Sequence, residues 1–579
     1  MKDGSTGFEE STSEGQREGF DGCGWLAFTL FVWFVATVLG YLLYCPPAPL
    51  GSEVASKGEV SARRADEILK VLVGDDIPHP AGSEQNKVVR ERIIRLLQSW
   101  GYAVTQHKTQ NSRNPESDPI PLVNLMVRLP GRTSDAAIML ASHYDSKVGP
   151  GASDDGVGTA ALLEIARMLK SENETSEPLN DVIFLITDGE EMGLLGAEKF
   201  VEEHAWADEV EVVINLEARG TTGPSLMFET SDDSRWLVEL FSRVVSNPRA
   251  SSLFFEIYRF LPNDTDFTMF RQGGMQGYNF AFIGDVKNYH TLQDNYENAD
   301  RGSLQHHGQN ALALIRELKE MDLRSTPKGK AVYFDLFGKC VVWWPEVWSI
   351  WMSIIAIALL GFNTVSLARV GALSYFGAAS GFFAVGLVGF LTLAIVWLGG
   401  ICFSLDSRFE NAWIDSPVPV ELALWFLAST MIVGLLSWVS ILRNPECILI
   451  GALIFWSAFS IATSLLLSGA SYLFLVPLLV ACAASLVRYG DQIRVTPLGA
   501  FCFAAASAVI WLPNEQLFYD AVGFRMNIAM AVRVALVMTT LLPVLAITGT
   551  KARKVFCWSS FVALLVCVLA AIFLNPANP

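Results

Sequence analysis

The sequence predicts an α/β domain, with a mostly parallel-centred sheet flanked by helices, joined to an all-α domain that crosses a membrane several times. Two observations support this prediction. Residues 45–340 alternate short apolar segments with amphipathic ones, whereas residues 341–579 are almost all apolar and are broken by short polar loops. The net charge is −17, from 42 Lys and Arg against 59 Asp and Glu. Such an acidic chain lacks the basic surface that binds nucleic acid, so we expect no nucleic-acid partner.

The N-terminal segment predicts a tail and then a membrane anchor. Residues 1–23 are polar, acidic and rich in Gly and Ser, a composition typical of disorder. Residues 24–44 are 21 residues without a charged side chain. About 20 apolar residues in a helix cross the hydrocarbon core of a bilayer. Because no small-residue cleavage site follows this segment, we expect an uncleaved transmembrane helix.

The C-terminal region, residues 341–579, predicts about eight further helices in the lipid bilayer. Their expected ranges are 343–362, 377–404, 421–442, 447–468, 471–487, 496–513, 527–548 and 555–575. If residues 45–340 lie outside the cytosol, the inner loops hold Arg369, Arg443, Arg488, Arg494, Lys551, Arg553 and Lys554, and the outer loops hold Arg408 and Arg525. Basic loops favour the cytosolic side. We therefore expect a cytosolic N-terminus, a C-terminus on the opposite side, and an α/β domain in the periplasm, at the cell exterior or in an organelle lumen.

Strand and helix patterns alternate within residues 45–340. The expected strands are Ala136–Ser142, Asp181–Thr187, Glu211–Leu216 and Tyr278–Ile283, and the expected helices are Val157–Leu169 and Leu194–His204. This alternation favours a mostly parallel sheet covered on both faces, in which ligands bind at the carboxyl ends of the strands. None of the nine cysteines lies between Cys45 and Cys340, so a disulfide within this domain is excluded.

Polar clusters follow the expected strands at those carboxyl ends. They are His143-Tyr144-Asp145, Asp154 within the turn Gly151–Gly158, Asp188-Gly189-Glu190-Glu191, Glu217-Ala218-Arg219, and Tyr289-His290 with Asp294 just beyond. Each cluster alone is more typical of a surface turn, a helix cap or a structural histidine. Together they would bring several carboxylates and two histidines to one edge of a sheet. Buried carboxylates need compensation, and His with carboxylates is a ligand set that suits zinc.

These residues resemble the motifs of the zinc aminopeptidases of peptidase family M28. The resemblance covers about residues 60–320, and its motifs are HYDS, GASDDGVG, DGEEMGLLGA, NLEARG and YHTLQDN. With the anchor and the apolar C-terminal region, the whole chain resembles the membrane branch of this family, which includes an endoplasmic reticulum metallopeptidase of animals and a vacuolar membrane protease of fungi. It departs from many soluble members in having Glu217 where they have Asp.

The resemblance implies a role for each matching residue. Asp154 would bridge two Zn²⁺, with His143 and Glu217 completing one ion and Glu191 and His290 the other. Glu190 would be the general base. Asp145 and Asp294 would support the ligands from behind, Asp145 by fixing the His143 tautomer. A cis peptide bond is implied between Asp154 and Asp155, and Tyr289 would stabilise an oxyanion. The implied reaction is hydrolysis of the N-terminal peptide bond of a peptide substrate.

Other residues have less specific interpretations. Arg219 could bind substrate or form a structural salt bridge. Asp264 and Asp266 could contribute an acidic group near the pocket, with Asp266 as the candidate for binding substrate, or they could cap a helix. Asn173 and Asn263 match the N-glycosylation pattern. We expect His306 and His307 to be surface residues of a helix. Arg533 lies inside or at the edge of an expected membrane span, where an end residue that directs its charge to the interface is more typical than a functional charge within the membrane.

Three alternative functions remain open. The first two keep the fold but change the reaction: a carboxypeptidase, for which Arg219 is the obvious cation, or a glutaminyl cyclase-like enzyme, which would use one zinc. The third is a non-enzymatic membrane receptor or chaperone. Eight C-terminal helices exceed what an anchor needs, so they suggest a surface for a homo-oligomer or another membrane partner.

Overall fold

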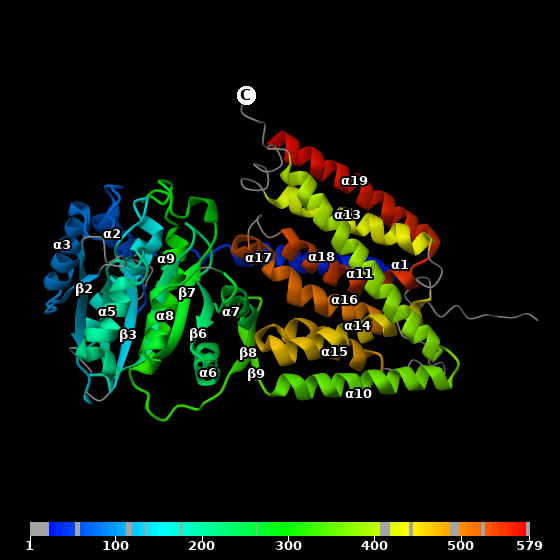
Figure 1. The fold of residues 1–579 in the computed structure, drawn as a ribbon, viewed down its shortest axis with the longest axis horizontal. Coiled ribbons are helices and arrows are strands. Elements are labelled where there is room, and N and C mark those ends of the chain that lie inside the picture. The colour runs from blue at the N-terminus through cyan, green and yellow to red at the C-terminus, as the bar shows by residue number, and fades with distance from the viewer. Residues whose placement is uncertain are drawn as a thin grey trace, which may run out of the picture.

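The structure, a computed structural model, describes residues 22–51, 58–111, 119–133, 136–173, 177–261, 263–405, 417–438, 444–486, 497–522 and 527–574. Most of the expected tail, residues 1–23, lies outside this description. Figure 1 shows two parts side by side: an α/β part, and a bundle of long helices formed by the N-terminal helix and the C-terminal region.

The α/β part contains a seven-stranded sheet with the order β1-β2-β4-β3-β5-β7-β6. Its strands are β1 (Thr105–Asn111), β2 (Ile120–Leu129), β3 (Ala137–His143), β4 (Asp181–Thr187), β5 (Val210–Ala218), β6 (Leu226–Thr230) and β7 (Gln276–Phe282). The four central strands, β4, β3, β5 and β7, are parallel, and the outer strands pair antiparallel. The expected fold class, an α/β sheet with a parallel centre beside a helical membrane-type region, is confirmed.

The sequence patterns located the four central strands and missed the outer ones. β1 has the sequence TQHKTQN, which lacks apolar alternation because it lies at the sheet edge. β2 carries Asn124 at a fully buried position, where its side chain donates to the Gly196 carbonyl at 2.7 Å. A two-stranded hairpin, β8 (Ala331–Leu336) and β9 (Cys340–Pro345), was also missed and leads into the bundle.

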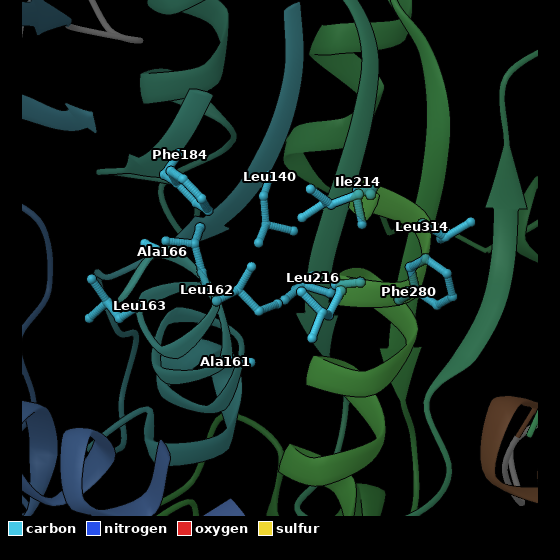
Figure 2. Close-up of a cluster of buried hydrophobic side chains, with 14 of the residues drawn as sticks. Leu140, Ala161, Leu162, Leu163, Ala166, Phe184, Ile214, Leu216, Phe280 and Leu314 are labelled. Carbon is cyan, nitrogen blue, oxygen red and sulfur yellow. The ribbon is translucent and has the colours of Figure 1, made fainter. Parts of the chain in front are cut away.

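The core of the α/β part lies between the sheet and α4 (Gly158–Asn173), which lengthens the expected helix Val157–Leu169 at its C-terminal end. Figure 2 shows Leu162 of α4 beside Leu140 and Leu216 of the central strands. All three side chains are fully buried. Burying a leucine contributes about 1.5–3 kcal/mol relative to leaving it exposed. This packing fixes α4, and therefore the turn that precedes it, against the carboxyl ends of β3 and β5.

Helices cover both faces of the sheet. α2 (Ala62–Val73), α4 and α9 (Arg301–Leu318) contact one another over the face that holds Leu140. α5 (Leu195–Glu203) and α8 (Asp266–Gln272) cover the opposite face, where Phe200 and Phe270 are fully buried. The other helices of eight or more residues in this part are α3 (Glu84–Ser99) and α6 (Arg235–Val244), and a short helix, α7 (Ser252–Tyr258), faces the bundle.

The bundle contains α1 (Gly22–Tyr44), α10 (Trp348–Arg369), α11 (Tyr375–Ser404), α13 (Pro417–Trp438), α14 (Pro445–Leu466), α15 (Tyr472–Ala484), α16 (Pro497–Trp511), α17 (Glu515–Val522), α18 (Asn527–Ile547) and α19 (Thr550–Leu574). Within the described residues, eight segments are long and apolar enough to cross a membrane. Seven of them correspond to the anchor 24–44 and to six expected C-terminal spans that the helices reproduce within several residues; the eighth, Pro497–Ala521, extends the expected span 496–513 through α17.

The expected span 471–487 differs from the others. Its helix, α15, has 13 residues, which is about 20 Å and shorter than a bilayer core of about 30 Å. It begins where Tyr472 bonds Ser251 of the α/β part at 2.8 Å. It then runs beside α10, where the Asn363 side chain donates to the Cys482 carbonyl at 3.1 Å.

The preferred interpretation of Arg533, with its charge directed to the interface, was wrong. Its side chain is 4% exposed and lies inside the bundle, not at an interface with water. Arg533 pairs with Glu421 of α13 at 2.7 Å and also with Glu515 of α17. Its two partners come from other helices, so the sequence around Arg533 gives no sign of them.

The expectation that His306 and His307 are surface residues was also wrong, since both are buried in α9. The Nδ1 of His306 accepts a hydrogen bond from the Ser225 amide at 3.1 Å, so the Nε2 carries the proton and donates to the Asn247 carbonyl at 2.9 Å. Burial lowers the pKa of His306 to about 4 and that of His307 to about 3. Both imidazoles are therefore neutral structural groups.

This assignment predicts an acid sensitivity for the fold. The pKa of His306 is about 4 in the folded chain against 6.5 for an unperturbed histidine. The contribution of neutral His306 to the free energy of unfolding is therefore complete above pH 6.5 and is lost as the pH falls toward 4. Between pH 8 and pH 5 this loss is about 2 kcal/mol. His306→Asn keeps an acceptor near the Nδ1 position and removes the titration. We expect the full chain to lose less melting temperature between pH 8 and pH 5 in this variant than in the wild type. Equal losses would contradict the assignment.

Candidate metal centre

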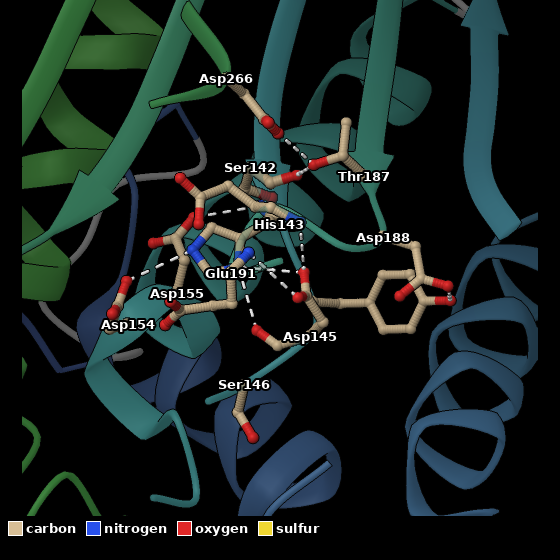
Figure 3. Close-up of polar contacts among 12 residues, drawn as sticks. Ser142, His143, Asp145, Ser146, Asp154, Asp155, Thr187, Asp188, Glu191 and Asp266 are labelled. Carbon is tan, nitrogen blue, oxygen red and sulfur yellow. Dashed lines mark hydrogen bonds and ion pairs between the residues drawn. The ribbon is translucent and has the colours of Figure 1, made fainter. Parts of the chain in front are cut away.

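The parallel strands bring the candidate residues to one edge of the sheet. His143 is the last residue of β3 and pairs in register with Thr187, the last residue of β4. Glu190 and Glu191 follow β4 within four residues, and Glu217 lies near the end of β5. Figure 3 shows His143, Asp154 and Glu191 converging at this edge, with Asp145 close beside them.

Two groups of potential metal ligands share one residue. His143, Asp154 and Glu217 form the first group, and Asp154, Glu191 and His290 form the second; in each, one ligand atom per residue lies within 4.8 Å of the others. The two oxygens of Asp154 face different histidines: Oδ1 is 3.3 Å from the His143 Nε2, and Oδ2 is 3.2 Å from the His290 Nε2. The structure thus brings together all five residues expected to bind metal.

The carboxyl groups of the site are buried together, and their pKa values show the cost of placing several negative charges there. Burial raises the pKa of Glu190 and of Glu217 well above the usual range of a carboxyl group, and neighbouring carboxylates add to the effect. Burial alone would lower the pKa of His290, but the nearby carboxylates of Asp154 and Glu191 raise it to about 9. The site therefore attracts cations.

The donor atoms themselves fit zinc. Imidazole nitrogens and carboxylate oxygens are common zinc ligands, and the two histidines and three carboxylates here offer both kinds to each of two positions. The Oδ2 of Asp154 and the Nε2 of His290 are buried and lie 3.2 Å apart, and neither atom makes a hydrogen bond of good geometry. Such orphaned atoms are costly unless they bind something. By holding a metal ion, Asp154 and His290 would satisfy both atoms.

Asp145 contacts His143 mainly through its backbone carbonyl, whereas we expected its side chain to do so. The Nδ1 of His143 lies 3.0 Å from the backbone carbonyl of Asp145 and 3.5 Å from its carboxylate, so the carbonyl is the closer acceptor that fixes the ring. The Asp145 carboxylate accepts the backbone amides of Glu190 at 3.0 Å and Glu191 at 3.2 Å. Asp145 therefore orients the turn after β4 as well as the histidine of β3.

Asp294 holds the turn that presents Asp154. Its carboxylate accepts the backbone amides of Ser153 at 2.7 Å and of Asp154 at 3.2 Å. Burial, together with the charge of Asp154, raises the pKa of Asp294 to about 7. The peptide bond between Asp154 and Asp155 is cis, as the sequence motif implied.

A cavity of about 90 Å³ opens beside these ligands. Asp154, Glu190 and Glu217 line it on one side, together with Arg219 and Tyr289. The Tyr289 ring stacks on the ring of His290, with the centroids 3.6 Å apart. The Nη1 of Arg219 donates to the Ala521 carbonyl of α17 at 3.3 Å, while its Nε is buried without a partner. Both residues are thus available to a ligand in the cavity.

Residues 124–315 match the model of peptidase family M28. The chain contains a peptidase M28 domain. Among curated relatives, the chain is 34% identical over 314 residues to endoplasmic reticulum metallopeptidase 1 of Homo sapiens, covering 50% of this chain and 34% of that protein. It is 32% identical to a vacuolar membrane protease of Yarrowia lipolytica, covering 49% of this chain and 30% of that protein. The chain thus spans about a third of the length of these relatives.

Solved structures similar to the M28 domain have low sequence identity. A glutaminyl cyclase of Porphyromonas gingivalis is 18% identical, with 45% of this chain and 98% of that chain covered and a TM-score of 0.37. A Zn-dependent exopeptidase from Parabacteroides distasonis is 18% identical, with 44% and 98% covered and a TM-score of 0.37.

Of two acidic residues expected near the pocket of the M28 domain, one lines the cavity and the other does not. Asp264 lines the cavity. Asp266, which we expected to bind substrate, is 1% exposed at the start of α8 and accepts a hydrogen bond from the Thr187 hydroxyl. Figure 3 shows this contact between Asp266 and the end of β4. Asp266 therefore supports the strand that leads to Glu190, and the expectation of direct substrate contact is corrected.

Sequence patterns missed several supporting residues of the M28 domain. Asp188 accepts hydrogen bonds from the Asn86 side chain at 3.0 Å and the Tyr144 hydroxyl at 2.9 Å. His307 lies with its Nε2 3.0 Å from the Glu217 carbonyl. Asn86 and His307 come from α3 and α9, far from the motifs in sequence, so only their chemistry as buried polar groups could have indicated a role.

The contact between Thr187 and Asp266 predicts a stability effect. Thr187→Val keeps the shape of the side chain but removes the donor, leaving a buried carboxylate without its hydrogen bond. Such a loss costs about 1–3 kcal/mol. We expect a lower melting temperature for the full chain carrying Thr187→Val, measured by intrinsic fluorescence.

Thr187→Ser is the matched control because it retains the hydroxyl and loses only a methyl group. If Thr187→Ser destabilises the chain as much as Thr187→Val, packing rather than the hydrogen bond to Asp266 accounts for the loss.

Proposed function

We propose that this chain is a membrane-anchored metallo-exopeptidase that binds two Zn²⁺ and removes residues from the N-termini of peptides. The observation that supports this most directly is the position of Asp154, whose two oxygens lie 3.3 and 3.2 Å from two different histidines. A carboxylate in this position can bridge two ions. In this proposal residues 24–44 are the anchor, residues 45–340 are the peptidase domain, and residues 341–579 are a membrane domain.

Each side chain of the site would have its own role in peptide hydrolysis. When bound, zinc would polarise the scissile carbonyl and make a water molecule more acidic. Glu190, the site carboxylate outside both ligand groups, would accept the proton of that water and later deliver it to the nitrogen of the leaving amine. Its burial favours this role, because a raised pKa suits a group that must take up and release a proton. The Tyr289 hydroxyl would stabilise the oxyanion.

An aminopeptidase fits the charge of the cavity better than the alternatives. Glu190, Glu217 and Asp264 give its lining an acidic character, which suits the ammonium group of a peptide N-terminus. Arg219, also in the lining, favours carboxypeptidase activity as the second candidate, because its guanidinium could bind a substrate carboxylate. A cyclase would use one zinc, whereas two ligand groups are present. A non-enzymatic receptor would not need metal ligands, so the presence of the complete ligand set argues against this alternative.

Zinc content and peptide cleavage test this proposal together. We expect the purified full chain, reconstituted in nanodiscs, to bind about two zinc ions and to release N-terminal residues only from peptides with a free amine. Glu190→Gln should keep the zinc and lose activity by about 10²–10⁴-fold, the usual contribution of general acid–base catalysis. His290→Ala should lose one ion, whereas Asp154→Ala should lose both.

Each other outcome has a distinct meaning. Release from the C-terminus, lost in Arg219→Ala, would establish the carboxypeptidase alternative. Zinc binding with cyclisation of N-terminal glutamine in place of hydrolysis would establish the cyclase alternative. A folded chain that binds no metal would refute the central claim.

We further propose that the peptidase domain lies on the non-cytosolic side of the membrane. The first residue of α1, Gly22, accepts a hydrogen bond from the Thr548 hydroxyl, next to the basic residues Lys551, Arg553 and Lys554. The other end of α1, Tyr44, bonds Asp520 beside the M28 domain at 2.6 Å. These basic residues thus lie at the end of the bundle far from the peptidase, and basic ends favour the cytosol.

Protease protection tests this orientation. In sealed vesicles whose outer face is cytosolic, we expect an N-terminal tag to be digested, while the peptidase domain and a C-terminal tag are protected. That result requires nine crossings, with the short helix α15 counted as one. Digestion of both tags would mean that α15 does not cross, and digestion of the peptidase domain would reverse the orientation.

A further inference from the structure

A helix of the bundle forms one wall of the cavity beside the metal ligands. Leu517 and Ala521 of α17 line the same cavity as Asp154, Glu190 and Glu217. Leu517 is 1% exposed, so its side chain is enclosed by the surrounding groups and is not on the bundle surface. The M28 domain by itself would therefore leave this side of the cavity open to water.

Hydrogen bonds from the N-terminal part of the chain hold α17 at this position. The Ala521 carbonyl accepts from Arg219 of the M28 domain at 3.3 Å, and the Asp520 carboxylate accepts from Tyr44 at 2.6 Å. Just before α17, the Asn514 side chain accepts from Arg249 of the M28 domain at 3.2 Å. Two of these contacts come from the domain that supplies the metal ligands, so α17 is fixed relative to the reacting groups.

Ion pairs within the bundle hold the other end of α17. Glu515, its first residue, pairs with Arg533 of α18 and accepts a hydrogen bond from the Trp425 indole at 2.7 Å. Arg533 pairs in turn with Glu421 of α13 at 2.7 Å. A buried guanidinium with two carboxylates strongly disfavours separation of these helices, since removing one partner leaves an uncompensated charge. Helices α13 and α18 therefore determine where α17 lies.

Much of the lining away from the ligands is apolar. Beside Leu517 it includes Phe228 on β6, Phe254 and Ile257 on α7, and Leu261. An apolar pocket next to a reactive centre binds an apolar side chain, with polar groups fixing the orientation. Asp264, also in the lining, would orient the substrate through its amino group.

We propose that α17 of the membrane bundle forms one wall of the substrate side-chain pocket, so that the bundle selects peptides with an apolar residue at the scissile bond. This inference rests on the proposed exopeptidase function. It gives the C-terminal helices a role beyond anchoring, because a residue of the bundle contacts the side chain that the enzyme recognises.

Binding of two hydroxamates to the zinc-loaded full chain in nanodiscs tests the pocket without requiring turnover. L-leucine hydroxamate and glycine hydroxamate share the metal-binding group and differ in the apolar side chain. We expect the wild type to bind the leucine compound at least about tenfold more tightly, since one methylene in an apolar pocket is worth about 10–200-fold. Leu517→Trp fills the space and Leu517→Ala removes the contact. Both should lower this ratio to less than about threefold.

Leu565→Trp is the matched control, because Leu565 lies on α19 with 48% of its surface exposed. It should keep the wild-type ratio. Equal affinities of the wild type for both hydroxamates, no binding of either, or an unchanged ratio in both Leu517 variants would overturn the inference. Failure of the proposed function is distinguishable: the hydroxamate ratio would respond to Leu517 while peptides with free N-termini remain uncut.

Discussion

The burial of several carboxylates at one edge of the sheet is the constraint on which the rest of the structure depends. Asp154, Glu191 and Glu217 lie with only two histidines in a region largely removed from water. A group of this kind is stable only if its charges are balanced. The carboxylates behind this group, Asp145 and Asp294, are balanced in part by backbone amides that donate to them. The carboxylates Asp154, Glu191 and Glu217 still need positive charge nearby. The same residues are therefore the ones suited to bind zinc.

The parallel centre of the sheet explains how residues far apart in the chain reach this edge. Each central strand ends in a short loop, and because the strands run in one direction, all of these loops meet. His143 and Thr187 end neighbouring strands in register, which sets the spacing between the first ligand and the turn of Glu190. Supporting groups such as Asp266 and His307 then fix these strand ends from the two faces of the sheet. Precise placement matters because misplacement by about 1 Å can cost 10²-fold in rate.

The bundle and the M28 domain are connected through the site and not only through the chain. α17 contacts the cavity on one side and the Arg533 ion pairs on the other. A single short helix therefore joins the charged centre of the bundle to the space where substrate would lie. This arrangement offers a physical reason why a peptidase domain would be attached to many membrane helices when one helix is enough to anchor it.

Local patterns in the sequence determined the central strands, the long apolar helices and the residue types of the metal centre. Each of these depends on periodicity or composition within one segment, as in the apolar run of β3 that ends at His143. Tertiary structure alone decided the outer strands, the burial of His306 and His307, the support of Thr187 by Asp266, and the pairing of Arg533 with Glu421 and Glu515. These features arise from contacts between segments that are distant in sequence. A polar side chain is exposed or buried according to the partner that packing brings to it, and its own sequence neighbours do not specify that partner.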